Sequence, residues 1–149
     1  TPRSNRRQRQ MCIRDRSGSS KPVFAGIVEE VDVFDIETGR WHTLPAAANI
    51  PTPRAGTMAA VTDGKLVILG GESAGQKQAH SEVEVLDPST LEWSRLAPLL
   101  TPRHGAQAIV RENGLYIAGG NATRGGGNEL VALERMGLRQ SNDKPGDSP

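Results

Sequence analysis

The stretch TPRAGTMAAVTDGKLVILGG at residues 52–71 returns as TPRHGAQAIVRENGLYIAGG at residues 101–120. Arg54 and Arg103, near the starts of the two copies, are 49 positions apart. Both copies end in a glycine pair and contain an apolar run before it. One building block of roughly 50 residues is therefore used more than once in this chain.

A second phrase repeats in step with the first. VDVFDIETGRWHTL at residues 31–44 aligns with VEVLDPSTLEWSRL at residues 83–96, and Trp41 and Trp93 are 52 positions apart. The spacing differs between the two phrases where the connecting segments differ in length, which loops tolerate. The repeat therefore contains two phrases in a constant order.

The complete unit, residues 51–99, predicts four short strands joined by turns. Asp63-Gly64 suits a tight hairpin, and the DPST segment at residues 87–90 suits a second turn. The apolar run at residues 66–69 predicts an inner strand covered on both faces. The alternation of Glu84 with two valines predicts a strand nearer solvent. The predicted strands are residues 54–61, 65–71 and 82–86, with a last one marked by Trp93 and Leu96.

The flanking units are partial. The first supplies predicted strands at residues 30–35 and 40–44, and the third at residues 103–110, 115–120 and 128–134. The segment LVALERM in the third unit also suits a short helix on propensity. Gln140 stands where a tryptophan is expected.

A double glycine followed by a spaced tryptophan resembles the pattern of the kelch-repeat family. This resemblance implies an all-β fold, a kelch-type β-propeller fragment made of four-stranded antiparallel blades. The expected units are residues 28–50, 51–99 and 100–138. These are too few blades to close a ring, because a propeller needs about four to eight blades. Trp93 is expected to wedge against the next blade. The structural repeat residues are Gly70, Gly71, Trp93, Gly119, Gly120 and Trp41.

The front of the chain has a different character. RRQRQMCIRDR at residues 6–16 back-translates codon by codon into DNA that resembles a transposase adapter used in building sequencing libraries. We interpret residues 1 to about 16 as translated adapter DNA and expect residues 1–27 to be artefactual or disordered. The alternative is a basic, nucleic-acid-binding arm. The polar segment 139–149 is expected to be a disordered tail.

Setting the first sixteen residues aside changes the charge balance. The remainder carries 12 basic and 16 acidic side chains, which argues against nucleic acid as a partner. No apolar run approaches the length of about 18 residues that a membrane span needs. The only cysteine, Cys12, lies in the excluded segment, so cysteine usage leaves the cellular compartment open.

Few residues suggest catalysis. Tyr116 is the only tyrosine, so a copper-radical site of the galactose oxidase kind has no ligand set here. The histidines His42, His80 and His104 are isolated in sequence, without metal-ligand spacing. We therefore predict no catalytic residue, no metal and no cofactor in this segment.

The recurring arginines are the most suggestive polar residues. Arg54 and Arg103 begin the inner strands, where a guanidinium can tie loop carbonyls together, and we favour this structural role over ligand binding. Among weak ligand-binding candidates we include Arg54 together with Arg103, His104 and Arg124, which suit an anionic or sugar-like partner.

These observations favour a non-catalytic recognition module that binds a protein or glycan ligand at the propeller mouth, the end of the ring where the loops gather. One alternative is part of a sugar-processing propeller enzyme, similar to galactose oxidase or a sialic acid epimerase, whose active residues lie in other blades. Another is a repeat array that serves only as a spacer. The fold alone does not decide among them.

Overall fold

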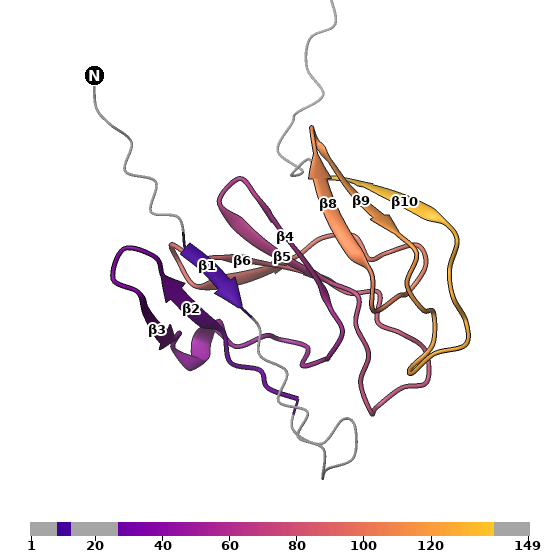
Figure 1. Cartoon of the computed structure of the whole chain (residues 1–149), viewed down its shortest axis with the longest axis horizontal. Coiled ribbons are helices and arrows are strands. Elements are labelled where there is room, and N and C mark those ends of the chain that lie inside the picture. Colours follow the sequence, from indigo (N-terminus) through magenta and orange to yellow (C-terminus); the bar gives the residue numbers. More distant parts are fainter. Residues whose placement is uncertain (1–8, 13–26, 139–149) are drawn as a thin grey trace, which may run out of the picture.

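The structure is a computed structural model that describes residues 27–138 together with the backbone of Arg9–Cys12. The described residues form short strands and one 3-10 helix (Figure 1). The elements are β1 (Arg9–Cys12), β2 (Asp32–Asp35), β3 (Arg40–Thr43), η1 (Ala46–Ala48), β4 (Met58–Thr62), β5 (Lys65–Leu69), β6 (Val83–Asp87), β7 (Glu92–Arg95), β8 (Gln107–Arg111), β9 (Gly114–Ala118) and β10 (Leu133–Gly137).

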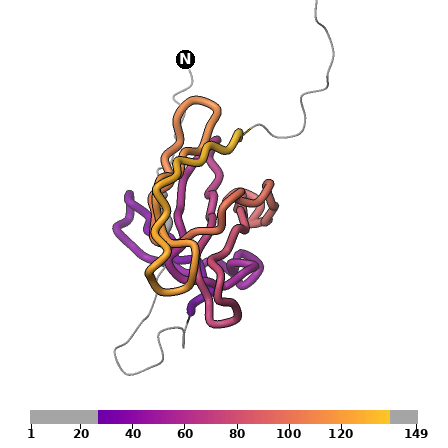
Figure 2. Tube along the Cα trace, turned by 90° about the vertical axis from the view of Figure 1, so that its right-hand side faces the viewer, coloured from indigo at the N-terminus to yellow at the C-terminus, as the bar shows by residue number. Residues whose placement is uncertain are grey.

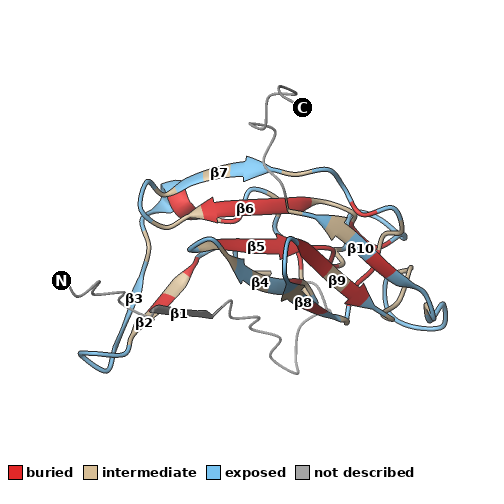
Figure 3. Ribbon diagram, turned by 90° about the horizontal axis from the view of Figure 1, so that it is seen from above, coloured by how far each residue is buried: buried red, intermediate tan, exposed pale blue. Residues whose placement is uncertain are grey.

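The strands form three antiparallel sheets, which we call blades 1, 2 and 3. Blade 1 has the order β1-β2-β3, blade 2 the order β4-β5-β6-β7, and blade 3 the order β8-β9-β10. The blades lie side by side and do not close a ring within the described part of the chain (Figures 1 and 3). The all-β propeller fold predicted from the repeat is confirmed.

The predicted turns form as their residues dictate. Asp63 and Gly64 both have positive φ, 50° and 74°, and they join Thr62 to Lys65 across the β4–β5 ladder. This geometry is that of a two-residue hairpin with primed turn angles. In the β6–β7 turn the Asp87 carboxylate accepts hydrogen bonds from the Ser89 amide and hydroxyl, at 2.9 and 2.6 Å. These bonds lower the pKa of Asp87.

Strand β5 is covered on both faces, as its sequence predicted. Leu66 and Ile68 pack into the cluster between blades 1 and 2, whereas Val67 and Leu69 pack into the cluster between blades 2 and 3. The alternation follows from the period of two in a strand. Figure 3 shows β5 and most of β6 as the buried centre of the molecule, while β7 lies exposed at the edge of blade 2.

Several strand boundaries differ from the prediction. The strands after Arg54 and Arg103 begin only at Met58 and Gln107, because the segments that carry the arginines are held by hydrogen bonds outside the ladders. In blade 3 the third strand is Leu133–Gly137 instead of residues 128–134, and the short helix does not form. Pairing of Glu134 with Ile117 sets this register.

Trp93 packs in the direction opposite to the one expected. Its indole Nε1–H donates to the Ala48 carbonyl at 3.1 Å, and its ring joins the cluster between blades 1 and 2. It therefore contacts the preceding blade's connection and not the next blade. Trp41, at the same register position in blade 1, is 47% exposed and lies 5.1 Å from the Phe34 ring centroid. The difference arises because Trp93 of β7 packs against the segment that contains Ala48, whereas no described segment covers Trp41 of β3 in the same way.

The N-terminal segment also departs from expectation at four residues. Arg9–Cys12 forms β1, which pairs antiparallel with β2, where the sequence analysis expected an artefactual or disordered segment. A ladder is made of backbone hydrogen bonds, so an open strand edge can pair with a segment of any sequence that extends beside it. The remainder of residues 1–27 and the tail at 139–149 lie outside the described residues, except Ile27. The adapter origin stays a prediction.

Candidate functional site

Two buried arginines repeat one set of contacts in blades 2 and 3. The Arg54 side chain donates to the carbonyls of Gly70 and Thr52, at 2.5 and 2.6 Å. The Arg103 side chain donates to the equivalent carbonyls of Gly119 and Thr101, at 3.0 and 3.2 Å. They are only 2% and 0% exposed. This geometry supports the structural role, since both guanidinium groups are buried and donate to backbone carbonyls of their own blades.

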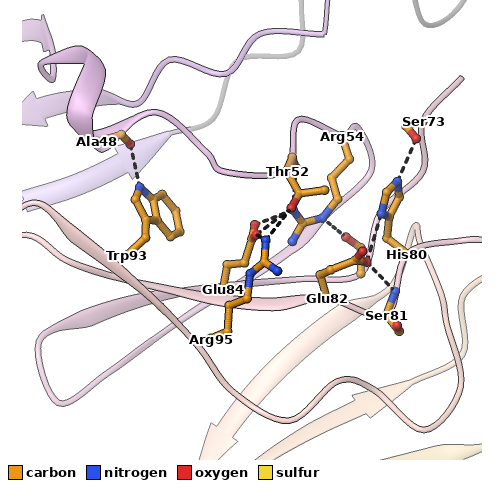
Figure 4. A network of polar contacts seen from close by, with 11 residues as sticks. Ala48, Thr52, Arg54, Ser73, His80, Ser81, Glu82, Glu84, Trp93 and Arg95 are labelled. Atoms are coloured by element: carbon orange, nitrogen blue, oxygen red, sulfur yellow. Dashed lines mark hydrogen bonds and ion pairs between the residues drawn. The ribbon is translucent and has the colours of Figure 1, made fainter. Parts of the chain in front are cut away.

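Each arginine also holds a buried carboxylate that the sequence analysis missed. Arg54 lies 2.7 Å from Glu84, and Arg103 lies 3.0 Å from Glu134 (Figure 4 shows the first pair). Glu84 was expected on a solvent-facing strand but is fully buried. The signal was present in the spacing, because the acids follow their arginines by 30 and 31 positions. Alternation with valines cannot distinguish a glutamate that faces solvent from one that faces a buried cation.

The glycine pairs let the next part of the chain approach closely. Gly70 has φ 63°, and a Cβ placed on it would collide with the Arg103 carbonyl oxygen and the Met58 side chain. Gly71 donates its amide to the same Arg103 carbonyl at 2.9 Å. At Gly120, with φ 89°, a Cβ would lie 2.7 Å from the His104 carbonyl. The pairs are therefore required by packing between segments as well as by backbone conformation.

Two long loops come together beside the inner strands, and we call residues 72–82 and 121–130 the mouth loops. Four hydrogen bonds tie them together. Ala79 donates its amide to Ala122 at 2.9 Å, and Gly125 donates its amide to the Glu72 carboxylate at 2.7 Å. Arg124 contributes the other two, from its amide to Lys77 at 2.7 Å and from its side chain to Ala74 at 2.9 Å. The loops thus form one preorganised surface across two blades.

His104 lies beneath this surface. It is 6% exposed, and its Nε2 lies 2.8 Å from the Thr123 carbonyl, so Nε2 carries the proton and donates. The Glu72 carboxylate stands 3.6 Å from the same nitrogen. His104 therefore fastens the second mouth loop to the first and is turned inward. Its place among ligand-binding candidates finds no support in this geometry.

A second histidine belongs to a relay within the first mouth loop. The Ser73 hydroxyl lies 2.8 Å from His80 Nε2, and His80 Nδ1 lies 3.0 Å from the Glu82 carboxylate (Figure 4). Burial acts to raise the pKa of Glu82, but an amide hydrogen bond, the bond to His80 and the charges of His80 and Arg54 together lower it. An ionised Glu82 only accepts, so His80 Nδ1–H donates to it, and a ring with this single proton leaves Nε2 to accept from the Ser73 hydroxyl.

Of the four predicted ligand candidates, only Arg124 is exposed; Arg54, Arg103 and His104 are buried. Lys77, which the sequence analysis did not single out, is exposed opposite it on the first mouth loop. Within residues 27–138 no group of three or more His, Asp or Glu side chains is placed to hold a metal ion. In the same range no helix is long and apolar enough to cross a membrane.

The arrangement of repeated blades agrees with a comparison to known families. The sequence profile of the KLHDC2/KLHL20/DRC7 Kelch-repeats domain matches residues 4–143. The chain belongs to the kelch-repeat family. The glycine pairs, the spaced Trp93 and the four-stranded blade 2 are the kelch features that the structure displays directly.

Proteins similar to this chain come from plants, viruses and animals. Acyl-CoA-binding domain-containing protein 5 of Arabidopsis thaliana is 32% identical over 136 residues, covering 83% of this chain and 20% of that protein. Kelch-like protein 25 of Homo sapiens is 33% identical over 117 residues, covering 77% and 20%. Kelch repeat protein C2 of vaccinia virus (strain Western Reserve) is 30% identical over 93 residues, covering 62% and 17%. The chain spans about a fifth of the length of these curated relatives.

Proposed function

We propose that this kelch-repeat chain is a protein-binding module that holds its partner with the two mouth loops. The observation that carries the proposal is the set of four hydrogen bonds that joins the loops across blades 2 and 3. A surface fixed before binding loses little conformational entropy when a partner docks. The kelch relatives support an interaction module at the level of the family.

The exposed side chains suggest the chemistry of the partner. Lys77 and Arg124 stand on opposite mouth loops, and the Arg124 amide donates to the Lys77 carbonyl at 2.7 Å, so the two residues are neighbours. Glu72, on the first mouth loop, accepts from the Gly125 amide at 2.7 Å and lies 3.6 Å from His104 Nε2. Two adjacent cations favour a carboxylate-bearing segment of a partner protein, since guanidinium and ammonium groups bind carboxylates with charge-assisted hydrogen bonds.

An array of acidic peptides, probed beside a glycan array, tests this function. We expect the chain to bind acidic peptides, and Lys77→Ala with Arg124→Ala to weaken binding by about tenfold or more. Arg111→Ala is the matched control, because Arg111 is also exposed but lies on β8, where its guanidinium is 4.0 Å from Glu112. Binding to glycans alone, or equal loss in the control, would contradict the proposal.

A second candidate function rests on the Ser73–His80–Glu82 relay. The order of hydroxyl, imidazole and carboxylate is the one that activates serine for nucleophilic attack. With an alkyl phosphonofluoridate, Ser73 Oγ would form a bond to phosphorus, fluoride would leave, and His80 Nε2 would take the hydroxyl proton. Acyl esters would be the corresponding substrate class.

Labelling with that reagent separates the two functions. If Ser73 is activated, it is modified about 100-fold faster than Ser89, whose hydroxyl bonds to Asp87 without a histidine. His80→Gln then removes the difference. Equal, slow labelling of both serines would leave the relay as a purely structural hydrogen-bond chain and retain only the binding function.

A further inference from the structure

The relay in the first mouth loop has no counterpart in the second mouth loop, although the backbones of the two loops are held in the same way. The amide of His80 donates to the carbonyl of Gly71 at 2.7 Å, and the amide of Leu130 donates to the carbonyl of Gly120 at the same distance. His80 and Leu130 therefore occupy equivalent positions in blades 2 and 3.

The other two members of the relay are replaced as well. Glu82 and Ala132 are equivalent, because their carbonyls accept from the first glycine of each pair, at 3.0 and 3.4 Å. Ser73 and Ala122 are equivalent, because each directly follows the residue that forms a β-bridge with the neighbour of the buried arginine. Serine, histidine and glutamate in blade 2 thus correspond to alanine, leucine and alanine in blade 3.

The backbone of a mouth loop does not need the relay, since blade 3 makes the same bonds with apolar residues. His80 is only 5% exposed, and burial of an imidazole beside a carboxylate costs free energy that a leucine at the same position does not. The polar trio is therefore accounted for by the chemistry that it gives to Ser73, and not by the needs of the fold.

The hydroxyl of this serine is accessible from the mouth. The two mouth loops lie beside each other at the lower end of the molecule in both views, the first in pink and the second in orange (Figures 1 and 2). Ser73 is partly buried. A Cβ placed on Gly75 would meet, beyond its chain neighbours, only the Ser73 hydroxyl, at 3.9 Å. The space beside this hydroxyl is therefore open to a molecule that arrives from solvent.

Two positive charges stand next to the serine. The Arg124 guanidinium donates to the carbonyl of Ala74, the residue after Ser73, at 2.9 Å. The Arg124 amide donates to the Lys77 carbonyl at 2.7 Å, and both cationic residues are exposed. Because consecutive Cα atoms are only about 3.8 Å apart, the guanidinium is a neighbour of the hydroxyl. A molecule that reacts at Ser73 thus meets cations that bind carboxylates.

We propose that Ser73 cleaves carboxylic esters whose acyl part carries a second, ionised carboxylate, and that Lys77 and Arg124 select these substrates by binding that carboxylate. This substrate class rests on the relay function proposed above. It adds to that function the part of the site that distinguishes one ester from another.

The reaction has two steps of the same kind. Ser73 Oγ forms a bond to the ester carbonyl carbon, and His80 Nε2 takes the hydroxyl proton while its Nδ1–H donates to Glu82. The bond between the carbonyl carbon and the alcohol oxygen breaks, and the alcohol leaves with the proton from His80. Water then attacks the acyl-serine by the same route, which releases the acid and restores the serine.

The p-nitrophenyl monoester of terephthalic acid tests the proposal on the full chain. It is compared with the neutral ester in which an amide replaces the free carboxylate, and each rate is divided by that ester's own hydrolysis in buffer. The ring keeps the carboxylate away from its own ester, so it cannot cleave it from within. We expect kcat/KM for the anionic ester to be higher by about tenfold or more. The Ser73→Ala variant gives the background rate.

Charge-removing variants identify the residues that select the substrate. Lys77→Gln with Arg124→Gln should bring the preference for the anionic ester close to one, while glutamine can still donate to the Ala74 carbonyl. Arg111→Gln is the matched control and should keep the preference, because Arg111 is exposed on β8 beside Glu112. Loss of the preference in this control would contradict selection by the mouth loops.

A triple variant separates the chemistry from folding. Ser73→Ala with His80→Leu and Glu82→Ala gives blade 2 the residues that blade 3 has at these positions. We expect its urea midpoint to stay close to that of the parent chain, and its turnover to fall by about 100-fold or more. Loss of the fold in this variant would show that the trio is architectural and would overturn the proposal.

The ester comparison distinguishes failure of the substrate class from failure of the relay function. Equal cleavage of the two esters would overturn the substrate class and leave the activation of Ser73 standing. No cleavage above the Ser73→Ala background would overturn both. Binding of acidic peptides by the mouth loops is measured separately on the peptide array and stands or falls by itself.

Discussion

Blade 2 and blade 3 have the same interior but different outer edges. Both hold a buried arginine against a carboxylate and the carbonyl of the first paired glycine. Blade 2 adds a fourth strand with Arg95 and Trp93, whereas the described part of blade 3 ends at β10. The comparison teaches that the inner strands are sufficient for the buried hydrogen bonds and ion pair of a blade. The outer strand of blade 2 adds a second cation beside the carboxylate and a contact with the preceding blade.

The largest expected effect comes from removing the buried arginines. Arg54→Ala leaves the fully buried Glu84 with Arg95, which lies mostly in solvent, and should destabilise the fold by about 3–5 kcal/mol. Arg103→Ala should cost less, because Glu134 is slightly exposed and keeps two amide donors. Urea unfolding of both variants measures the difference. Equal losses would contradict the idea that partial exposure and two amide donors protect Glu134.

The glycine pairs provide the next test. Gly70→Ala should cost about 2–4 kcal/mol, since it combines strain at positive φ with a collision against the Arg103 carbonyl. Gly119→Ala has nearly the same φ, 68°, but the nearest atom to its Cβ lies at 3.6 Å, so only the strain of about 1–2 kcal/mol is expected. Thermal unfolding distinguishes them. A larger loss for Gly119→Ala would refute the packing argument.

The tryptophans give a smaller contrast. Trp93→Phe removes the hydrogen bond to Ala48 and should cost about 1 kcal/mol beyond the loss of ring contacts. Trp41→Phe, at the same ladder position in blade 1, removes a ring that is half exposed and should be milder. Chemical denaturation with tryptophan fluorescence reports both. The reverse order would mean that Trp93 does not anchor blade 2 to blade 1.

The smallest expected effect is a dependence of stability on pH. The pKa of Glu82 is lowered below its ordinary value of 4.5, so its contribution is fully present above that value and is lost as pH falls through the lower, folded pKa. Blade 3 has Ala132 at the equivalent position. Glu82→Gln should therefore flatten the acid side of the stability profile. An unchanged acid profile in this variant would contradict the assignment.

Local sequence was sufficient to predict the repeated elements of the fold. The turn at Asp63 and Gly64, the two-sided burial of β5 and the structural use of Arg54 were all predictable, because each depends on a residue's own geometry or on a recurring pattern. The partner of Arg54 was not found. Glu84 alternates with valines as a solvent-facing residue would, and only its burial against Arg54 and Arg95 distinguishes the two cases.

The mouth loops show most clearly where sequence reasoning ended. The sequence analysis predicted no contact between these loops, yet His104, Glu72 and Arg124 tie them together from positions distant in the chain. The relay through His80 likewise joins residues that had looked isolated. Such contacts depend on how neighbouring blades bring loops side by side, which no local pattern records.

Sequence by itself determined that this chain builds near-identical β-blades, because strand period, turn residues and paired glycines act over a few residues and recur at a constant spacing. Tertiary structure alone decided which blade Trp93 touches, which acids the buried arginines hold, and that Arg9–Cys12 pairs with β2. The physical reason is distance along the chain. Burial, charge pairing and edge-strand pairing are set by neighbours in space, and those neighbours exist only once the blades stand side by side.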